Sequence, residues 1–368
     1  MRYRTLTATQ ISQLRSLRCN PHAVPLEDDL VADATAVEVV RALGCAAGRS
    51  AGGPWRPRLT LSLELMSELA MVDGSIGWVA MVGAANSVLL RSVELALGRG
   101  PEPEPLTADD AGRRFVAANA LACGSVRRGG LSGRWRMVSG ACDADVFVLG
   151  FRPPELPEPG TGSSLAVVAV DAVACHGDWD AVGLPDSDSG TVEVAAHPVD
   201  PASCIGFVPR DPRWQLASEE LPATASTWLV AGIAAVAHGL VGSAHRELRD
   251  LDRAPDAVDL AEKEAAQGWN RLLDLAAQAD AAATDRRPTP PACCAELRLV
   301  AMELVDMCLP MALEALGLAG TAGIGSSSPV GRAVCDLLVL RQHNMVSPRL
   351  RTWLNATVRG DGERPELV

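Results

Sequence analysis

Lysine is almost absent from this chain of 368 residues: it occurs once, at Lys263, and arginine carries nearly all of the positive charge. The 45 acidic residues outnumber the 33 basic ones, and the formal net charge is −12. A surface that binds nucleic acid needs positive charge to neutralise phosphates. The charge balance therefore argues against nucleic acid as a partner, while the 48% of hydrophobic residues indicates a globular protein.

Signals for metal binding, secretion and membrane insertion are also missing. The ten cysteines form no CxxC pair, and Cys293-Cys294 has no second Cys/His pair at ligand spacing, so we expect no metal site. The N-terminus MRYRTLTATQ has no apolar core, which favours a cytoplasmic protein with reduced thiols. The apolar run from Trp228 is shorter than the roughly 20 residues of a membrane span and contains His238. It predicts a buried bundle helix.

The first region, residues 1–105, reads as helical. Leu61, Leu65, Leu69 and Val72 recur at helical spacing behind Thr60, which is a candidate N-cap. The next pair of residues, Asp73-Gly74, is expected to break that helix, and Ser75 to cap the one that follows. The PEPEP run at 101–105 reads as a linker.

The second and third regions differ in character. Residues 106–210 hold short runs of β-formers between Gly, Pro and Asp-rich turns, with a loop at 153–162, and predict a β domain of barrel or sandwich type. Residues 211–368 predict a C-terminal four-helix bundle. Its expected helices are 223–250, 255–284, 292–317, and one from Pro329 to about Met345. The fold class is therefore mainly α with a central β domain.

Four segments, in this order, resemble the acyl-CoA dehydrogenase superfamily. The resemblance covers nearly the whole chain and is closest to the flavin-dependent monooxygenase branch, which includes two-component hydroxylases and natural-product tailoring enzymes. The segments are ELAMVDGSIGWVAMVGAAN (68–86), GGLSGRWRMVSGACDADVFVLG (129–150), WDAVGLPDSDSGTVEVAAHPV (179–199) and SSPVGRAVCDLLVLRQH (327–343).

The resemblance implies a flavin site on the second segment. There Trp135 and Ser139-Gly140 would flank the ring, with Ser139 bonded to its N5/O4 edge and stabilising its oxygen adduct. A hydroxyl donor beside a glycine suits this role, because glycine lets backbone approach the ring closely. A serine in an ordinary strand turn is the alternative reading. Ser189 of the third segment is a further implied cofactor contact.

The last segment supplies three more candidates. By resemblance His343 is a base or a hydrogen-bond partner for substrate, although a structural bundle histidine fits equally well. Arg332 and Asp336 either lie near cofactor or subunit contacts or form an i,i+4 ion pair, and the ion pair is favoured.

The chain departs from the family pattern at three positions. Asn86 stands where many aromatic hydroxylases of this branch have a histidine beside the substrate, and we take it as a candidate catalytic residue. Cys335 and Leu338 replace an arginine and a histidine of the last-helix pattern. These departures argue against a simple phenol as substrate.

A missing carboxylate separates oxygenation from desaturation. An acyl-CoA dehydrogenase needs an acid to remove the α-proton, but none occurs between Glu314 and Asp336 or between Glu220 and Glu247. We therefore expect a monooxygenase that hydroxylates or N-oxidises a small natural-product intermediate with reduced FMN or FAD and molecular oxygen. The flavin would come from a separate reductase, because no strand–GxGxxG–helix motif appears.

Two alternatives stay open. One is an acyl-thioester dehydrogenase with an unusual base, such as His238 or His343, and the other is a cyclase or binding protein without redox chemistry. The resemblance also implies a homotetramer, and the apolar helix 228–242 together with the terminal helix is the expected interface.

Overall fold

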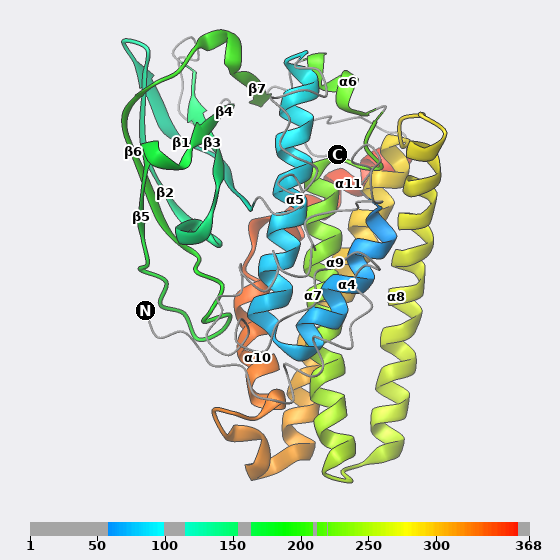
Figure 1. Cartoon of the computed structure of the whole chain (residues 1–368). Helices are drawn as coiled ribbons and strands as arrows, with labels where there is room; N and C mark the ends of the chain where they lie inside the picture. Colours follow the sequence, from blue (N-terminus) through cyan, green and yellow to red (C-terminus); the bar gives the residue numbers. More distant parts are fainter. Residues whose placement is uncertain (1–57, 99–114, 154–162, 209–211, 219, 360–368) are drawn as a thin grey trace, which may run out of the picture.

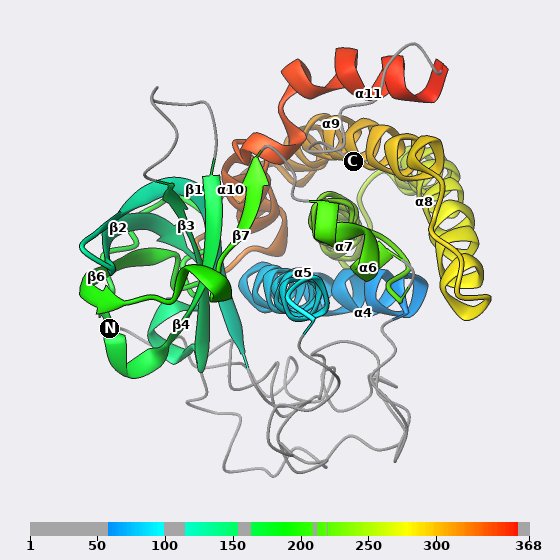
Figure 2. The same ribbon diagram turned by 90° about the horizontal axis from the view of Figure 1, so that it is seen from above.

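A computed structural model describes residues 58–98, 115–153, 163–208, 212–218 and 220–359 (Figure 1). The expected linker at 101–105, nearly all of the loop at 153–162 and most of the N-terminal region lie outside the described residues. Within the described ranges, a curled sheet lies on one side of the molecule and long helices pack together on the other (Figures 1 and 2).

Two consecutive helices, α4 (Leu59–Val72) and α5 (Gly74–Ala96), open the described chain. The predicted break between them is confirmed, since Asp73 has an extended backbone with φ −154°. Its carboxylate caps α5 by accepting the Ser75 and Ile76 N–H groups at 2.9 and 3.3 Å. The prediction that Ser75 caps α5 is wrong, because its hydroxyl accepts the Asp186 N–H instead, at 3.2 Å.

The predicted N-cap of α4 also needs correction, and the apolar spacing that indicated the helix does not coincide with its buried face. Thr60 lies inside the helix. The carboxylate of Asp280 in α8 (Pro255–Thr284) accepts the N–H groups of Leu59 and Thr60 at 2.7 and 3.0 Å. Leu61 is 44% exposed. The buried hydrophobic side chains are Leu59, Leu63, Met66, Leu69 and Ala70. A cap from a distant helix allows α4 to begin where no local capping residue stands.

The β domain is a seven-stranded sheet in the order β5-β6-β2-β1-β3-β4-β7, in which β1 and β3 are parallel and the other neighbours antiparallel. Its strands are β1 (Val116–Arg127), β2 (Gly130–Val138), β3 (Val146–Arg152), β4 (Ser163–Ala169), β5 (Val173–His176), β6 (Gly190–Pro198) and β7 (Ile205–Val208).

The sheet bends around a tryptophan. β1 shifts register against β3 between Asn119 and Gly124, and Trp135 of β2 is fully buried beneath this bend. A Cβ at Gly124 or at Gly133 would stand 2.6 Å from the Trp135 indole ring. Glycine at these positions therefore makes room for the indole inside the curled sheet.

The C-terminal helices are α7 (Ala225–Asp250), α8 (Pro255–Thr284), α9 (Pro291–Ala319), α10 (Pro329–Leu340) and α11 (Arg351–Arg359), preceded by the short α6 (Gln215–Ser218). The three predicted long helices are confirmed to within two residues at each end. The fourth stops at Leu340 rather than near Met345, and α11 was not predicted.

Helix α7 is the centre of the helical part and packs against α4, α5, α9 and α10 (Figure 2). Apart from the partly buried Leu229, its apolar residues from Trp228 to Val241 are buried inside the chain, so the expectation that this helix forms a subunit interface is wrong. By length and composition, α5 and α7 pass a test for membrane spans, but 78% and 72% of their apolar windows are buried. Burial of this extent identifies them as core helices.

Replacing Asp280 with Ala should lower the free energy of unfolding by about 1–2 kcal/mol, because two N–H groups at the start of α4 lose their acceptor. Asp274→Ala, an exposed acid on the same helix, is the matched control and should change stability by less than about 0.5 kcal/mol. Denaturant unfolding of both variants provides the measurement. Equal effects would show that Asp280 is not a cap.

Candidate active site

Three elements meet at one point between the sheet and the helices. Trp78 of α5 donates its indole N–H to Ser139 Oγ, at the end of β2, over 3.0 Å. The same indole lies edge-to-face with the ring of His343, which follows α10, at a centroid distance of 6.0 Å. The structure therefore brings together two predicted site residues through Trp78. Trp78 belongs to a segment that carried the family resemblance, but it was not predicted to be a site residue.

The turn that carries Ser139 depends on glycine. Gly140 has φ +65°, a left-handed conformation that favours glycine, and its N–H donates to the Ser187 carbonyl at 2.9 Å. Ser139 Oγ lies 2.8 Å from Ser189 Oγ, which lies 2.8 Å from Ser187 Oγ. Three of the predicted residues, Ser139, Gly140 and Ser189, are thus neighbours, and Ser187 joins them.

An exposed apolar residue, Met137, precedes Ser139 by two positions on the chain. Met137 is 68% exposed and has φ +58°, an unusual conformation for a residue with a side chain. It lies where β2 shifts register against β6, between Trp135 and Val138. A flat polar ring needs both an apolar surface and a donor at its edge, and Met137 and the Ser139 hydroxyl are of these two kinds. The residues present therefore fit a flavin ring.

Trp135 is not part of this surface. Its side chain is fully buried, and its indole N–H donates to the Gly150 carbonyl at 2.8 Å. The predicted cofactor contact is therefore replaced by a structural role inside the β domain. The sequence pattern did not distinguish the two roles, because both place a tryptophan shortly before the Ser-Gly turn.

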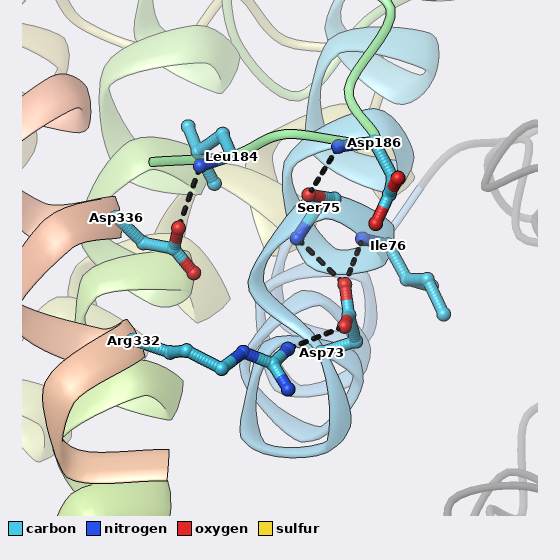
Figure 3. A network of polar contacts seen from close by, with 7 residues as sticks. All are labelled: Asp73, Ser75, Ile76, Leu184, Asp186, Arg332 and Asp336. Carbon is cyan, nitrogen blue, oxygen red and sulfur yellow. Dashed lines mark hydrogen bonds and ion pairs between the residues drawn. The ribbon is translucent and has the colours of Figure 1, made fainter. Parts of the chain in front are cut away.

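A polar network fastens the loop 179–189 to the helices (Figure 3). Asp336 Oδ1 of α10 accepts the Leu184 N–H at 2.6 Å, and Ser75 of α5 accepts the Asp186 N–H. The Trp179 indole donates to the Leu184 carbonyl at 2.8 Å. These contacts fix the loop that carries Ser187 and Ser189.

Arg332 forms an ion pair with Asp73 at 2.7 Å, so it reaches from α10 to the start of α5 (Figure 3). The prediction paired Arg332 with Asp336 along one helix. Instead Asp336 accepts from Leu184, and each side chain joins α10 to a different element. The described contacts of Arg332 and Asp336 thus join parts of the protein to one another. A contact of either residue with the cofactor stays a prediction.

Close backbone approach makes this network possible. A Cβ at Gly74 would lie 2.3 Å from Asp336 Oδ2 and 2.9 Å from Leu240 Cδ2. A Cβ at Gly183 would lie 2.2 Å from the Cys335 carbonyl oxygen. Both positions therefore need glycine to let α10 approach α5 and the loop.

Asn86 has a structural partner. Its side-chain Nδ2 donates to the Val116 carbonyl at 2.9 Å and so ties α5 to the first residue of β1. The side chain is half-buried. This bond uses one of the two Nδ2 protons. The role predicted for Asn86 beside the substrate remains a prediction.

His343 lies beyond the helix on which it was expected. It caps the short 3-10 turn Asn344–Val346, and its Nδ1 accepts the Met345 N–H at 3.3 Å. A neutral ring with an accepting Nδ1 carries its proton on Nε2. Burial lowers the pKa of His343 to about 4, so the ring is neutral at pH 7. The geometry favours a hydrogen-bond donor over a base.

The other proposed base, His238, lies elsewhere. Its Nδ1 is 2.9 Å from Ser67 Oγ, and its ring stacks on Trp269 of α8 at a centroid distance of 4.4 Å. Helix α8 lies across the bundle from the sheet (Figure 2). His238 is thus a helix-packing residue, and it is excluded as a base at the Ser139 site.

In the part of the chain that the structure describes, none of the polar partners of Trp78, Ser139 and His343 is a carboxylate. The acid next to Ser189 is Asp188, whose carboxylate accepts the Cys142 N–H at 2.8 Å. Burial raises the pKa of Asp188. The site is therefore built from an indole, hydroxyls and an imidazole.

Comparison with known proteins places this architecture. Residues 227–348 match the family described as acyl-CoA dehydrogenase, C-terminal domain. XiaF from Streptomyces sp., solved with FADH2 and glycerol, superposes with a TM-score of 0.74 and 16% identity, over 97% of this chain and 96% of that one. The chain has the acyl-CoA dehydrogenase fold. The resemblance predicted from the four sequence segments is confirmed.

Two proteins that are similar to this chain in sequence are monooxygenases. The indole-3-acetate monooxygenase of Acinetobacter baumannii is 24% identical over 86% of this chain and 83% of its own length. The enzyme of the same name from Pseudomonas putida is 25% identical over 82% of this chain and 79% of its own. On the acyl-CoA dehydrogenase fold, this chain is thus similar to the oxygenases.

Gly74→Ala should destabilise the protein by more than about 2 kcal/mol, because the new methyl group collides with Asp336 and Leu240 and displaces the loop anchor. Gly317→Ala on α9 is the matched control, since nothing lies within 4 Å of its Cβ. It should be neutral or stabilising by up to about 1 kcal/mol. Thermal unfolding of both variants measures this, and equal effects would contradict the role of Gly74.

Proposed function

We propose that the protein is a flavin-dependent monooxygenase that oxygenates a small, electron-rich molecule with reduced FMN or FAD and molecular oxygen. The observation that carries the proposal is the meeting of Trp78, Ser139 and His343 between the sheet and the helices, without a carboxylate among their partners. The monooxygenases among the relatives support it.

The residues that would surround the flavin have different roles. When bound, reduced flavin supplies the activation of oxygen. The half-buried Ser139 would offer its hydroxyl to the ring, and the exposed Met137 would offer an apolar surface. Gly140, at φ +65°, would let the backbone of the turn approach the ring. Ser139 and Gly140 are the residues of this chain that would contact the ring, and Ser189 would support Ser139 from behind.

His343 supports a substrate that needs no deprotonation by the protein. Its Nδ1 is occupied by the Met345 N–H, so the ring offers Nε2–H to an oxygen or nitrogen acceptor. A substrate with its own electron-rich carbon or nitrogen, such as an indole or an amine, suits such a site better than a phenol. Intermediates of natural-product synthesis contain both groups, and the two curated relatives are named for indole-3-acetate.

A dehydrogenase acting on an acyl thioester is less well supported. That reaction needs a base at the α-carbon. His238 lies on the far side of α7, and His343 presents a proton rather than a lone pair. Among the described residues, no feature favours a cyclase or a binding protein over an oxygenase.

The proposal includes a separate flavin reductase, a cytoplasmic location and a homotetramer. The reductase follows from the lack of a nicotinamide-binding motif. Because α7 is buried, subunit contacts would use outer helices such as α10 and α11, where Leu338 and Trp353 are partly exposed. Equilibrium titration with photoreduced FMN and FAD tests the cofactor directly, and absence of saturable binding for both flavins would contradict the function.

Ser139→Ala should divert oxygen consumption from product to peroxide and lower product formation about ten-fold, because one hydrogen bond at the reacting edge is lost. The measurement is the ratio of peroxide to oxidised indole-3-acetate, used as a probe, with photoreduced flavin. Ser132→Ala on the same strand, whose hydroxyl accepts the exposed Ala196 N–H, is the control. Unchanged coupling in Ser139→Ala would count against its assignment.

The pH profile separates the two roles of His343. With a pKa of about 4, its neutral form persists from pH 8 to about pH 5, so kcat/KM should stay flat there and fall only toward pH 4. An unperturbed histidine base would lose activity below about pH 6.5. His343→Gln keeps a donor near the Nε2 position and should retain more activity than His343→Leu. Equal losses in both variants, with a fall near pH 6.5, would indicate a base.

A further inference from the structure

Three serine hydroxyls and one indole are linked in a row of hydrogen bonds. Because each hydroxyl has only one proton to donate, the donor of each bond can be deduced. Trp78 Nε1–H can only donate, so Ser139 Oγ accepts from it. The remaining bonds, from Ser139 to Ser189 and from Ser189 to Ser187, are each 2.8 Å and each use one hydroxyl proton. Three arrangements satisfy these distances: both protons pointing inward toward Ser187, both outward toward Ser139, or both toward Ser189. The third leaves the proton of Ser189, which is only 6% exposed, without an acceptor among the described residues, and so it is disfavoured.

The inward direction leaves a buried proton without an acceptor. Ser187 has no exposed area, and in the described part of the chain its hydroxyl has Ser189 as its one polar partner. If Ser139 donated to Ser189 and Ser189 to Ser187, the Ser187 proton would point into the protein unsatisfied. A buried unpaired donor is costly, and folded proteins rarely keep one.

The outward direction satisfies every group. Ser187 donates to Ser189, Ser189 donates to Ser139, and the last proton belongs to Ser139, which is half-buried and open to water or a ligand. Both lone pairs of Ser139 are then filled, by Trp78 and by Ser189. Bonds that run in one direction also polarise the last hydroxyl.

We infer that Trp78, Ser189 and Ser187 are positioning residues that make Ser139 a hydrogen-bond donor with no free acceptor position. The inference deepens the proposed function and rests on it for the identity of the ligand. Ser139 would pair with an acceptor of the ring, such as the carbonyl oxygen at C4 or the unprotonated N5 of oxidised flavin. It would not accept a proton from the N5–H of the reduced ring.

Neutron diffraction from perdeuterated, flavin-free crystals tests the direction without any ligand. The expected map has the Ser187 deuteron on the line to Ser189, the Ser189 deuteron on the line to Ser139, and the Ser139 deuteron directed away from both. Deuterons running from Ser139 toward Ser187 would overturn the inference. This result is independent of whether flavin binds.

A double-mutant cycle tests the consequence with oxidised FMN and FAD as probes. Ser187→Ala should weaken binding about three- to ten-fold when Ser139 is present, because the Ser139 proton is then free to turn inward. In the Ser139→Ala background the same change should have no effect. Ser187→Cys, which is slightly larger but keeps a weak donor, should fall between wild type and Ser187→Ala.

A merely structural role for Ser187 predicts a different result. Equal losses of flavin affinity in the presence and absence of Ser139 would show that Ser187 acts through packing, and would overturn the positioning role. Failure of the wild-type protein to bind either flavin would refute the proposed function while leaving the neutron result to decide the direction of the hydroxyl chain.

Discussion

The hydrogen bond from the Leu184 N–H to Asp336 holds the site together. Leu184 has φ +50°, a conformation that is strained for a residue with a side chain. The loop keeps this conformation because Asp336 accepts its N–H and Trp179 donates to its carbonyl. The same loop continues to Ser187 and Ser189, so the hydroxyls beside Ser139 are placed by a carboxylate on α10. The bond between Leu184 and Asp336 thereby fixes where α10 lies relative to the sheet.

A second carboxylate, that of Asp73, fixes the helix that carries Trp78. Asp73 ends α4, caps α5 and pairs with Arg332, so one side chain fixes the helix start from which Trp78 projects. Asp73 is almost fully buried, and an unpaired carboxylate there would be strongly unfavourable. The ion pair with Arg332 therefore ties α10 and α5 to a fixed relative position. Ser139, Trp78 and His343 meet because the three elements that carry them are fastened at these two acids.

Local signals in the sequence predicted the elements but not their partners. Helical spacing and the Asp73-Gly74 break located α4 and α5. The Pro-rich segment at 286–291 separated α8 from α9. The cap of α4 was missed because it comes from Asp280, more than 200 residues away. No local pattern contains that information, since only packing of α8 against α4 brings the carboxylate there.

The same limit applies to the site. Ser139, Gly140, Ser189 and His343 could be chosen from family-like segments, because those segments keep residue types in order along the chain. Trp135 was placed at the cofactor wrongly, since its burial depends on the bend of the sheet and on two glycines, Gly124 of the neighbouring β1 and Gly133 of its own strand. Likewise, the proton position on His343 follows from its place beyond α10, where the Met345 N–H meets Nδ1.

The polarity of the site explains how one fold serves two kinds of chemistry. Desaturation of an acyl thioester begins with removal of a proton from carbon, which requires an acceptor close to the ring. Here Ser139 and His343 present O–H and N–H groups, with Trp78 donating to Ser139. The nearby carboxylates of Asp73 and Asp336 accept from protein donors. Donors in a partly buried site stabilise negative charge that develops on oxygen. The carboxylates that hold this site together are thus engaged in structural contacts, and the groups left facing the ligand suit oxygen transfer rather than proton abstraction.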